Sequence, residues 1–201
     1  MKLHTYIINI KQRTDRYAHI INEVKKLPIL EYKVIEAVAS GTGLYSQPRI
    51  RCFQSHLNCI KLAKESELPY VLVLEDDATF TKNCLNSLRQ ALHEIDEMSW
   101  DMLYLGANLH SPACKISSNL LKLTGAWCTH AYIVHSNFYD TILSLPLDRE
   151  IDVHYTDLMR DNNIFMTNPI ISYQLPSHSD LQNEFCDYSG AMDDNFLKFT
   201  Q

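Results

Sequence analysis

Apolar positions along the chain recur with two different spacings, and these predict alternating strands and helices. Residues 3–10 are β-branched and aromatic, which is typical of a strand. Apolar residues at helical spacing follow and predict an amphipathic helix over residues 15–27, with Thr14 as its N-cap and Pro28 as its end. Residues 32–36 predict a second strand. This β-α-β opening is typical of a doubly wound, nucleotide-binding fold.

The same patterns predict further elements along one domain that takes in residues 1–201. Helices are expected over 50–66, 83–98, 136–145 (capped by Ser136) and 152–161, and strands over 102–105, 131–134 and 164–167. Residues 107–125 are polar, and the sequence leaves open whether they form a hairpin or an active-site flap. The C-terminal segment 174–201 is expected to be a loop or tail, either loosely ordered or closing over a site.

One apolar run is continuous and ends at three acids. Pro69 precedes the large apolar residues 70–74, and Glu75, Asp76 and Asp77 follow them directly. A short continuous apolar run predicts a strand covered on both faces, and ligands bind at the carboxyl ends of such strands. Neighbouring carboxylates repel one another, and a divalent cation such as Mg²⁺ or Mn²⁺ relieves that repulsion. The run alone favours neither a metal site nor a solvated acidic turn.

Composition narrows the function classes. The 201 residues are 46% hydrophobic and carry a formal charge of −6, which argues against a general nucleic-acid binder. No signal peptide or transmembrane run is recognisable, and six scattered cysteines without a Cys-x-x-Cys pair predict a reduced, cytoplasmic setting. Contact with a membrane surface and the oligomeric state stay open.

Polar residues near two expected helix starts are candidates for ligand binding. Asn9, Arg13 and Arg16 lie between the first strand and its helix, where cations can meet a diphosphate, although solvated helix-start residues have the same pattern. Cys52 and His56 stand four residues apart on the second helix, but no other ligand is near them in the sequence, so they do not predict a metal site.

Short segments that occur together in one order carry a resemblance to a known family. They are Tyr6–Ile10, Arg13–Arg16, Cys52–Leu57, Val71–Asp77, Trp100–Gly106, Thr129–Val134, Ile151–Asp152 and Ser179–Asp180. In these segments the chain resembles glycosyltransferase family 25, which includes lipooligosaccharide galactosyltransferases and the collagen galactosyltransferase domain.

The resemblance implies a GT-A-like α/β fold, with a Rossmann-type mixed sheet flanked by helices. It also implies a UDP-sugar donor, an inverting transfer to a glycan or protein hydroxyl, and an acidic motif that holds Mn²⁺ or Mg²⁺. Galactose is a candidate sugar, and lipopolysaccharide biosynthesis a candidate process. A non-catalytic nucleotide- or glycan-binding module and a nucleotide-sugar hydrolase remain alternatives.

Roles follow residue by residue. Asp77 is expected to bind the metal, with Glu75 on the same strand face, whereas Asp76 would point the other way in a regular strand. Asp76 is accordingly the first of the three acids to be considered structural, although Glu75 and Asp76 are also counted among the donor-binding residues. The resemblance together with charge adds Asn9, Arg13 and Arg16 to the donor site, and the resemblance alone adds Ser55 and His56. His178, ahead of His154, is the candidate for a further metal ligand from a late loop.

Asp152 is the expected general base. It precedes a predicted helix, whose N-terminus stabilises an ionised carboxylate, and the resemblance places an Ile-Asp pair here. A plain N-cap is the competing interpretation. Asp180 and Asp157 are the substitute candidates for the base.

Overall fold

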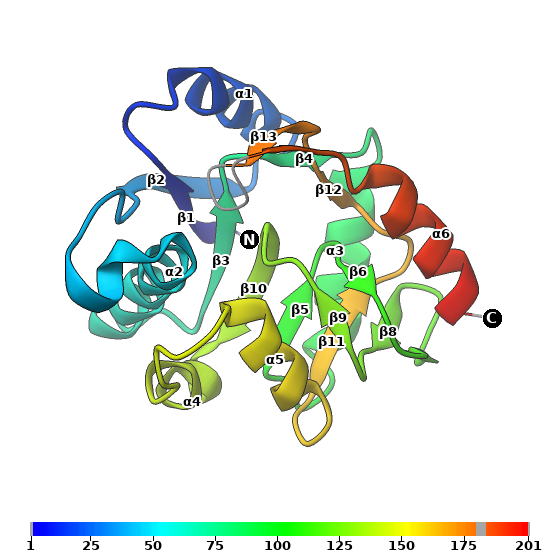
Figure 1. The fold of residues 1–201 in the computed structure, drawn as a ribbon. Coiled ribbons are helices and arrows are strands. Elements are labelled where there is room, and N and C mark those ends of the chain that lie inside the picture. Colours follow the sequence, from blue (N-terminus) through cyan, green and yellow to red (C-terminus); the bar gives the residue numbers. More distant parts are fainter. Residues whose placement is uncertain (1, 180–183, 201) are drawn as a thin grey trace.

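The structure is a computed structural model that describes residues 2–179 and 184–200, and a mixed sheet of eight strands runs through its centre (Figure 1). The strand order is β2-β1-β3-β10-β5-β11-β8-β7. These strands are β1 (Leu3–Asn9), β2 (Leu30–Glu36), β3 (Tyr70–Glu75), β5 (Met102–Tyr104), β7 (Cys114–Lys115), β8 (Leu120–Lys122), β10 (Ala131–His135) and β11 (Ile164–Thr167).

Shorter strand pairs and helices complete the described chain. The pairs are β4 (Ala78–Phe80) with β12 (Ser172–Gln174), β6 (Asn108–Leu109) with β9 (Ala126–Trp127), and β13 (Ser177–Ser179) with β14 (Glu184–Cys186). The helices are α1 (Thr14–Val24), α2 (Pro48–Glu65), α3 (Cys84–Ile95), α4 (Tyr139–Leu143), α5 (Ile151–Met159) and α6 (Ser189–Phe199), with 3₁₀ turns η1 (Gly43–Ser46) and η2 (Ser136–Phe138). Within the described residues, no helix combines the length and the apolar character that crossing a membrane requires.

Strand direction brings several chain segments to one edge of the sheet. β1, β2 and β3 are mutually parallel, β10 is antiparallel to β3 and to β5, and β5 is parallel to β11. The carboxyl ends of β1, β2, β3, β5 and β11 therefore share an edge with the start of β10. Ligands of α/β sheets bind at such an edge.

The continuous apolar run of β3 is explained by cover on both of its faces. Val71 and Val73 belong to the core cluster that contains Phe53 of α2, whereas Leu72 and Leu74 belong to the cluster that contains Ile20 of α1. These four residues of β3 are fully buried. A strand buried on both faces needs no polar alternation, so the prediction from the sequence is confirmed.

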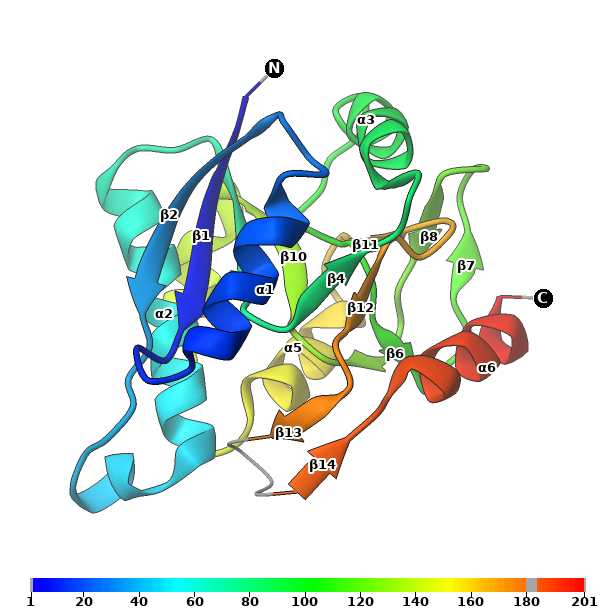
Figure 2. The ribbon, with the colours of Figure 1, turned by 90° about the horizontal axis from the view of Figure 1, so that it is seen from above.

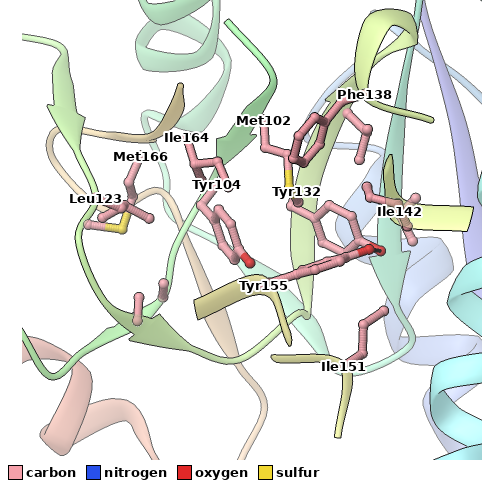
Figure 3. Packing of buried hydrophobic residues seen from close by; sticks show 14 of the residues in the cluster. Met102, Tyr104, Leu123, Tyr132, Phe138, Ile142, Ile151, Tyr155, Ile164 and Met166 are labelled. Atoms are coloured by element: carbon pink, nitrogen blue, oxygen red, sulfur yellow. Dashed lines mark hydrogen bonds between the residues drawn. The ribbon is translucent and has the colours of Figure 1, made fainter. Parts of the chain in front are cut away.

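Helices cover the two faces of the sheet in separate groups. Apolar residues of α1 and α3 pack on one face, and those of α2, α4 and α5 pack on the other. Figure 2 shows α1 and α2 on opposite sides of β1 and β2. On the face covered by α2, α4 and α5, the Tyr132 ring contacts Tyr104 in a tilted arrangement and Tyr155 edge-to-face, with ring centroids 5.9 and 5.5 Å apart (Figure 3). Such aromatic contacts add stabilisation beyond the buried area.

The elements expected from periodicity are present, with shifts at their ends. Thr14 is the first helical residue of α1 rather than its cap, and Arg13 at the cap position makes no side-chain cap hydrogen bond. Ser136 begins η2, and the His135 ring accepts the hydrogen bond from the Asn137 amide instead. The hairpin alternative for the segment 107–125 is confirmed in part, because β7 and β8 pair antiparallel.

The C-terminal segment differs most from its expectation. The sequence predicts a loop or tail that is either loosely ordered or closes over a site. In the structure β13 and β14 form a hairpin, and residues 189–199 form α6, which lies beside β6 (Figure 1). Asn195 of α6 donates to Asn108 of β6 at 2.8 Å, and Met192 is fully buried. Residues 189–199 have weak helical periodicity, so tertiary contacts decide this helix.

Gly106 lies just after β5, at the edge of the sheet where the parallel strands end, and has no room for a side chain. A Cβ at this position would lie 1.9 Å from the Ser172 carbonyl oxygen, which belongs to the backbone. We expect Gly106→Ala to lower the free energy of unfolding by about 3 kcal/mol, because the backbone of β12 must move away. Urea unfolding of the purified variant measures the change.

Gly190 offers the matched control for that measurement. A Cβ at Gly190 in α6 would have no heavy atom within 4 Å. Gly190→Ala should therefore be neutral or stabilising by about 0.5 kcal/mol, since alanine favours the helix. Equal effects of the two substitutions would show that the close approach of Gly106 to β12 is not tight.

Candidate active site

Three carboxylates gather where β3 ends. Glu75 is the last residue of β3, and Asp76 and Asp77 form a turn that leads into β4. The backbone of this acidic turn is held by the C-terminal segment, because the Leu175 amide donates to the Asp77 carbonyl at 2.7 Å. β4 also pairs antiparallel with β12. The turn is thus fixed on both sides rather than solvated and free.

Arg16 of α1 lies against two of these acids. One of its terminal nitrogens lies 3.1 Å from Asp76 Oδ1 and 3.2 Å from Asp77 Oδ2, and all three side chains are nearly buried. Asn9 at the end of β1 donates to Asp76 Oδ2 at 2.7 Å. The regular strand that would point Asp76 away from Asp77 ends at Glu75, and the turn that follows brings both aspartates to one cation.

Burial and mutual repulsion control the protonation of the aspartates. Burial, together with the charge of Glu75, raises the pKa of Asp77 from 3.8 to about 7, against the attraction of Arg16. Burial also raises the pKa of Asp76, although Arg16 and Asn9 act in the opposite direction. Asp77 Oδ1 is buried and has no hydrogen-bond partner in the described structure. A buried oxygen of this kind fits a cation ligand.

Glu75 has different neighbours. Its Oε1 accepts a hydrogen bond from the Thr129 hydroxyl at 2.9 Å and lies 3.6 Å from His56 Nε2. Burial opposes ionisation of Glu75, but the His56 ring and the Thr129 hydroxyl outweigh it and lower the pKa of this carboxyl. Glu75 therefore stays ionised, and its charge adds to burial in disfavouring ionisation of Asp77.

A cavity of about 810 Å³ opens beside the acids. Its lining combines the ends of β1 and β3 with α2, the start of α5 and the β13–β14 hairpin. The residues that line it include Ile8, Arg16, Val38, Arg49, Arg51, Cys52, Ser55, His56, Glu75, Asp76, Asp77, Trp127, Cys128, Thr129, Asp152, Ser177, Ser179 and Tyr188. A volume of this size accommodates a ligand as large as a nucleotide.

Ser55 and His56 reach the cavity from α2 and have structural partners. The Ser55 hydroxyl accepts from the Val38 amide at 2.9 Å and donates to the Arg51 carbonyl at 2.8 Å, so it holds the loop after β2 against α2. His56 is fully buried, and its Nδ1 is 2.8 Å from the Tyr132 hydroxyl. Both residues shape the wall next to Glu75.

Asp152 lies in the first turn of α5 and lines the same cavity. The N-cap of α5 is Glu150, so the interpretation of Asp152 as an N-cap is wrong. The Cys128 amide donates to Asp152 Oδ2 at 3.4 Å. Burial raises the pKa of Asp152, with the charges of Glu75 and Glu150 acting in the same direction, which increases the basicity of its carboxylate.

Two further candidates from the sequence, His178 and Arg13, are not among the described residues that line the cavity. His178 is exposed, whereas its neighbours Ser177 and Ser179 line the cavity, so the imidazole of His178 is not placed as a metal ligand. Its carbonyl instead accepts from Arg13 at 3.3 Å and from Arg16 at 3.0 Å. Arg13 also pairs with Asp15 at 3.0 Å and is not part of the cavity lining. Asp180 lies outside the described residues.

Asp157 and His154, the remaining candidates from the sequence, lie on α5 and contact the residues just before that helix. Asp157 pairs with Arg149 at 2.6 Å, and His154 is 2.8 Å from Asp148. Neither Asp157 nor His154 lines the cavity.

Sequence reasoning did not single out Trp127 and Cys128. Trp127 is 47% exposed, lines the cavity and contacts the His110 ring in a tilted arrangement, with ring centroids 4.4 Å apart. Cys128 adopts a positive φ of 77° beside Asp152, a conformation that non-glycine residues rarely adopt. The signal available in the sequence was a large aromatic residue in an otherwise polar stretch before the β10 run.

Comparison with solved structures shows that the chain has the GT-A fold. The crystal structure of S. aureus TarS 1-349 aligns with a TM-score of 0.57 and 15% identity, and the match covers 89% of this chain and 61% of that chain. A structure of the same TarS fragment in complex with UDP-GlcNAc aligns with a TM-score of 0.51.

Sequence comparison finds similarity to one family of glycosyltransferases. Residues 41–130 match the model of glycosyltransferase family 25 (LPS biosynthesis protein). Procollagen galactosyltransferase 2 of Homo sapiens is 24% identical over 221 residues, which cover 86% of this chain and 35% of that protein. A Bos taurus protein described as probable inactive glycosyltransferase 25 family member 3 is 25% identical over 53% of this chain and 22% of its own length.

The chain is thus similar to glycosyltransferase family 25 over residues 41–130, and to the procollagen galactosyltransferases over most of its length. It spans about a third of the length of the procollagen galactosyltransferases that it matches.

The raised pKa of Asp77 makes stability depend on pH. The folded state keeps a proton that the unfolded chain releases as the pH rises from 3.8 to about 7, so stability falls across this interval. In EDTA at pH 7.5, Asp77→Asn should raise the free energy of unfolding by on the order of 2 kcal/mol and flatten its pH dependence. Urea unfolding at several pH values measures both effects.

Asp194, exposed on α6, supplies the control. Asp194→Asn should leave the pH profile unchanged. If Asp77→Asn instead destabilised the protein at pH 7.5, the ionised carboxylate would be a net stabilising partner of Arg16.

Proposed function

We propose that this chain is a metal-dependent, inverting glycosyltransferase that moves a sugar from a UDP-sugar to a hydroxyl group of a glycan or protein. The observation that carries the proposal is the buried, unpartnered Asp77 Oδ1 beside Arg16 in a cavity of about 810 Å³. The UDP-GlcNAc complex of TarS and the activity named for the procollagen galactosyltransferases support this assignment.

Charge around the acidic turn favours a divalent cation. Three carboxylates and the Arg16 guanidinium leave two formal negative charges when Asp77 is ionised. Carboxylate oxygens are ligands of Mg²⁺ and Mn²⁺, and Asp77 is the first candidate ligand, with Glu75 beside it. A bound cation would neutralise the charge that develops on the leaving diphosphate.

Donor binding is assigned to the part of the cavity near β1. Ile8, Ala37 and Val38 offer an apolar wall at the carboxyl ends of β1 and β2, suited to the uracil ring. Arg16 Nε is buried without a hydrogen-bond partner, so this guanidinium retains a donor for an anionic oxygen. Asn9 acts indirectly, because it holds Asp76 next to Arg16.

Asp152 is the proposed general base. Its carboxylate would take the proton of the acceptor hydroxyl while the new bond to the sugar C1 forms and the bond from C1 to the diphosphate breaks. Trp127 lies at the same end of the cavity as Cys128 and Asp152, and its exposed ring offers an apolar face to a sugar. The acceptor is therefore assigned to the Trp127 end.

Binding of UDP should require a divalent cation. UDP with Mn²⁺ should raise the melting temperature, whereas UDP in EDTA should not, because the acids would repel a diphosphate. Saturation at about 100 times Kd adds about 2.7 kcal/mol, which a thermal-shift assay detects. Asp77→Asn should lose this metal-dependent shift and lower sugar turnover by about 100-fold or more, whereas Asp194→Asn should retain both.

An equal shift of wild type in EDTA would remove the metal from donor binding. A metal-dependent shift without transfer to any acceptor, and without hydrolysis of the UDP-sugar, would make the chain a non-catalytic binding module.

Asp152→Asn separates catalysis from binding. The variant should lower transfer by about 10²–10⁴-fold while leaving the affinities for UDP and Mn²⁺ within about twofold of wild type. Asparagine has the shape of aspartate and can still accept from the Cys128 amide, so the cavity wall is preserved. Initial-rate assays beside calorimetric titration with UDP measure the two quantities.

Asp157→Asn is the matched control on the same helix. Asp157 pairs with Arg149 outside the cavity, so its loss should leave transfer near the wild-type rate. Near-normal transfer by Asp152→Asn would exclude it as the base, and a strong loss in Asp157→Asn would point to that residue instead.

A further inference from the structure

A second group of potential metal ligands lies in the cavity wall, formed by Cys52 and His56 of α2 with Glu75 of β3. Cys52 and His56 are one helical turn apart, and the fold adds Glu75 from a distant part of the chain. The Cys52 sulfur, a His56 ring nitrogen and a Glu75 carboxylate oxygen all lie within 4.8 Å of one another. The three side chains line the cavity, which a small ion can enter.

The two ring nitrogens of His56 have different surroundings, and these suit His56 to bind a metal. Nε2 is buried without a hydrogen-bond partner in the described structure and lies 3.6 Å from Glu75 Oε1. Nδ1 is 2.8 Å from the Tyr132 hydroxyl, which in turn is 3.3 Å from the Tyr155 hydroxyl (Figure 3). A metal-binding histidine commonly donates its other ring N–H to an oxygen acceptor such as a carboxylate, a carbonyl or water, and the Tyr132 hydroxyl oxygen can accept in the same way, which leaves Nε2 for the metal.

Distances and ligand chemistry agree on the kind of cation. Zinc bonds of 2.0–2.3 Å in a tetrahedron place ligand atoms about 3.5 Å apart, close to the separation of His56 Nε2 from Glu75 Oε1. The Cys52 sulfur lies within 4.8 Å of the other two ligand atoms, so a change in its side-chain torsion can bring it into the tetrahedron. A thiolate and an imidazole with a single carboxylate favour Zn²⁺ over Mg²⁺ or Mn²⁺.

We propose that Cys52, His56 and Glu75 form a Zn²⁺ site in the cavity wall, with a fourth coordination position open to the cavity. Binding displaces the proton of the Cys52 thiol to solvent, as zinc does at cysteine ligands generally. This site shares Glu75 with the acidic group around Asp77 and differs from it by its sulfur and nitrogen ligands. It stands whether or not the chain transfers sugars, because it depends only on the three ligands.

Cobalt substitution provides a direct test, because a Cys–Co²⁺ bond has its own absorption band. The full chain, reduced and metal-free, is titrated with Co²⁺ and then with Zn²⁺. Wild type should show a thiolate-to-cobalt charge-transfer band that saturates at one equivalent, and Zn²⁺ should abolish it. Cys52→Ser should lack the band, and Cys52→Ser and His56→Gln should each weaken Zn²⁺ binding by at least about tenfold.

Matched variants separate this site from its neighbours. Cys128→Ser removes another thiol of the same cavity, and Cys114→Ser removes an exposed one, so both should retain the band. Asp77→Asn should retain it as well, which distinguishes the site from the proposed donor metal. Absence of the band in wild type, or its persistence in a folded Cys52→Ser variant, would overturn the proposal.

Discussion

The contact of one arginine with two aspartates is the interaction on which the site depends. Arg16 lies within 3.2 Å of both Asp76 and Asp77, and without it the end of β3 would hold only negative charge. Arg16 comes from α1, so this contact ties the first helix to the functional edge of the sheet. Arg16 does not fully compensate the group, because burial and the charge of Glu75 together still raise the pKa of Asp77.

The rest of the fold holds this charged group in place. Burial of β3 on both faces fixes the point at which the apolar strand ends and the acids begin. The C-terminal segment then anchors the turn from the other side, through β12 and through the Leu175 amide. Gly106 allows β5 to approach β12 closely enough for that anchoring. The acids therefore lie in a rigid frame, which suits a site that must bind a cation in fixed geometry.

Local patterns in the sequence predicted β3, its acidic end and the helices α1, α2, α3 and α5, because burial imposes strict periods on them. The facing of Asp76 could not be predicted, since it depends on where the strand gives way to a turn. The partnership of Cys52 and His56 with Glu75 joins residues far apart in the chain, and spacing cannot show it. Helix α6 is decided by contacts with β6 rather than by its own periodicity.

The central claim is that the acidic turn binds a nucleoside diphosphate through a divalent cation. A crystal of the protein grown with Mn²⁺ and UDP, measured at a wavelength where manganese scatters anomalously, tests it most directly. The account predicts one anomalous peak about 2.2 Å from a carboxylate oxygen of Asp77 and in contact with the diphosphate. UDP in the cavity with no manganese peak at Asp77 would contradict it.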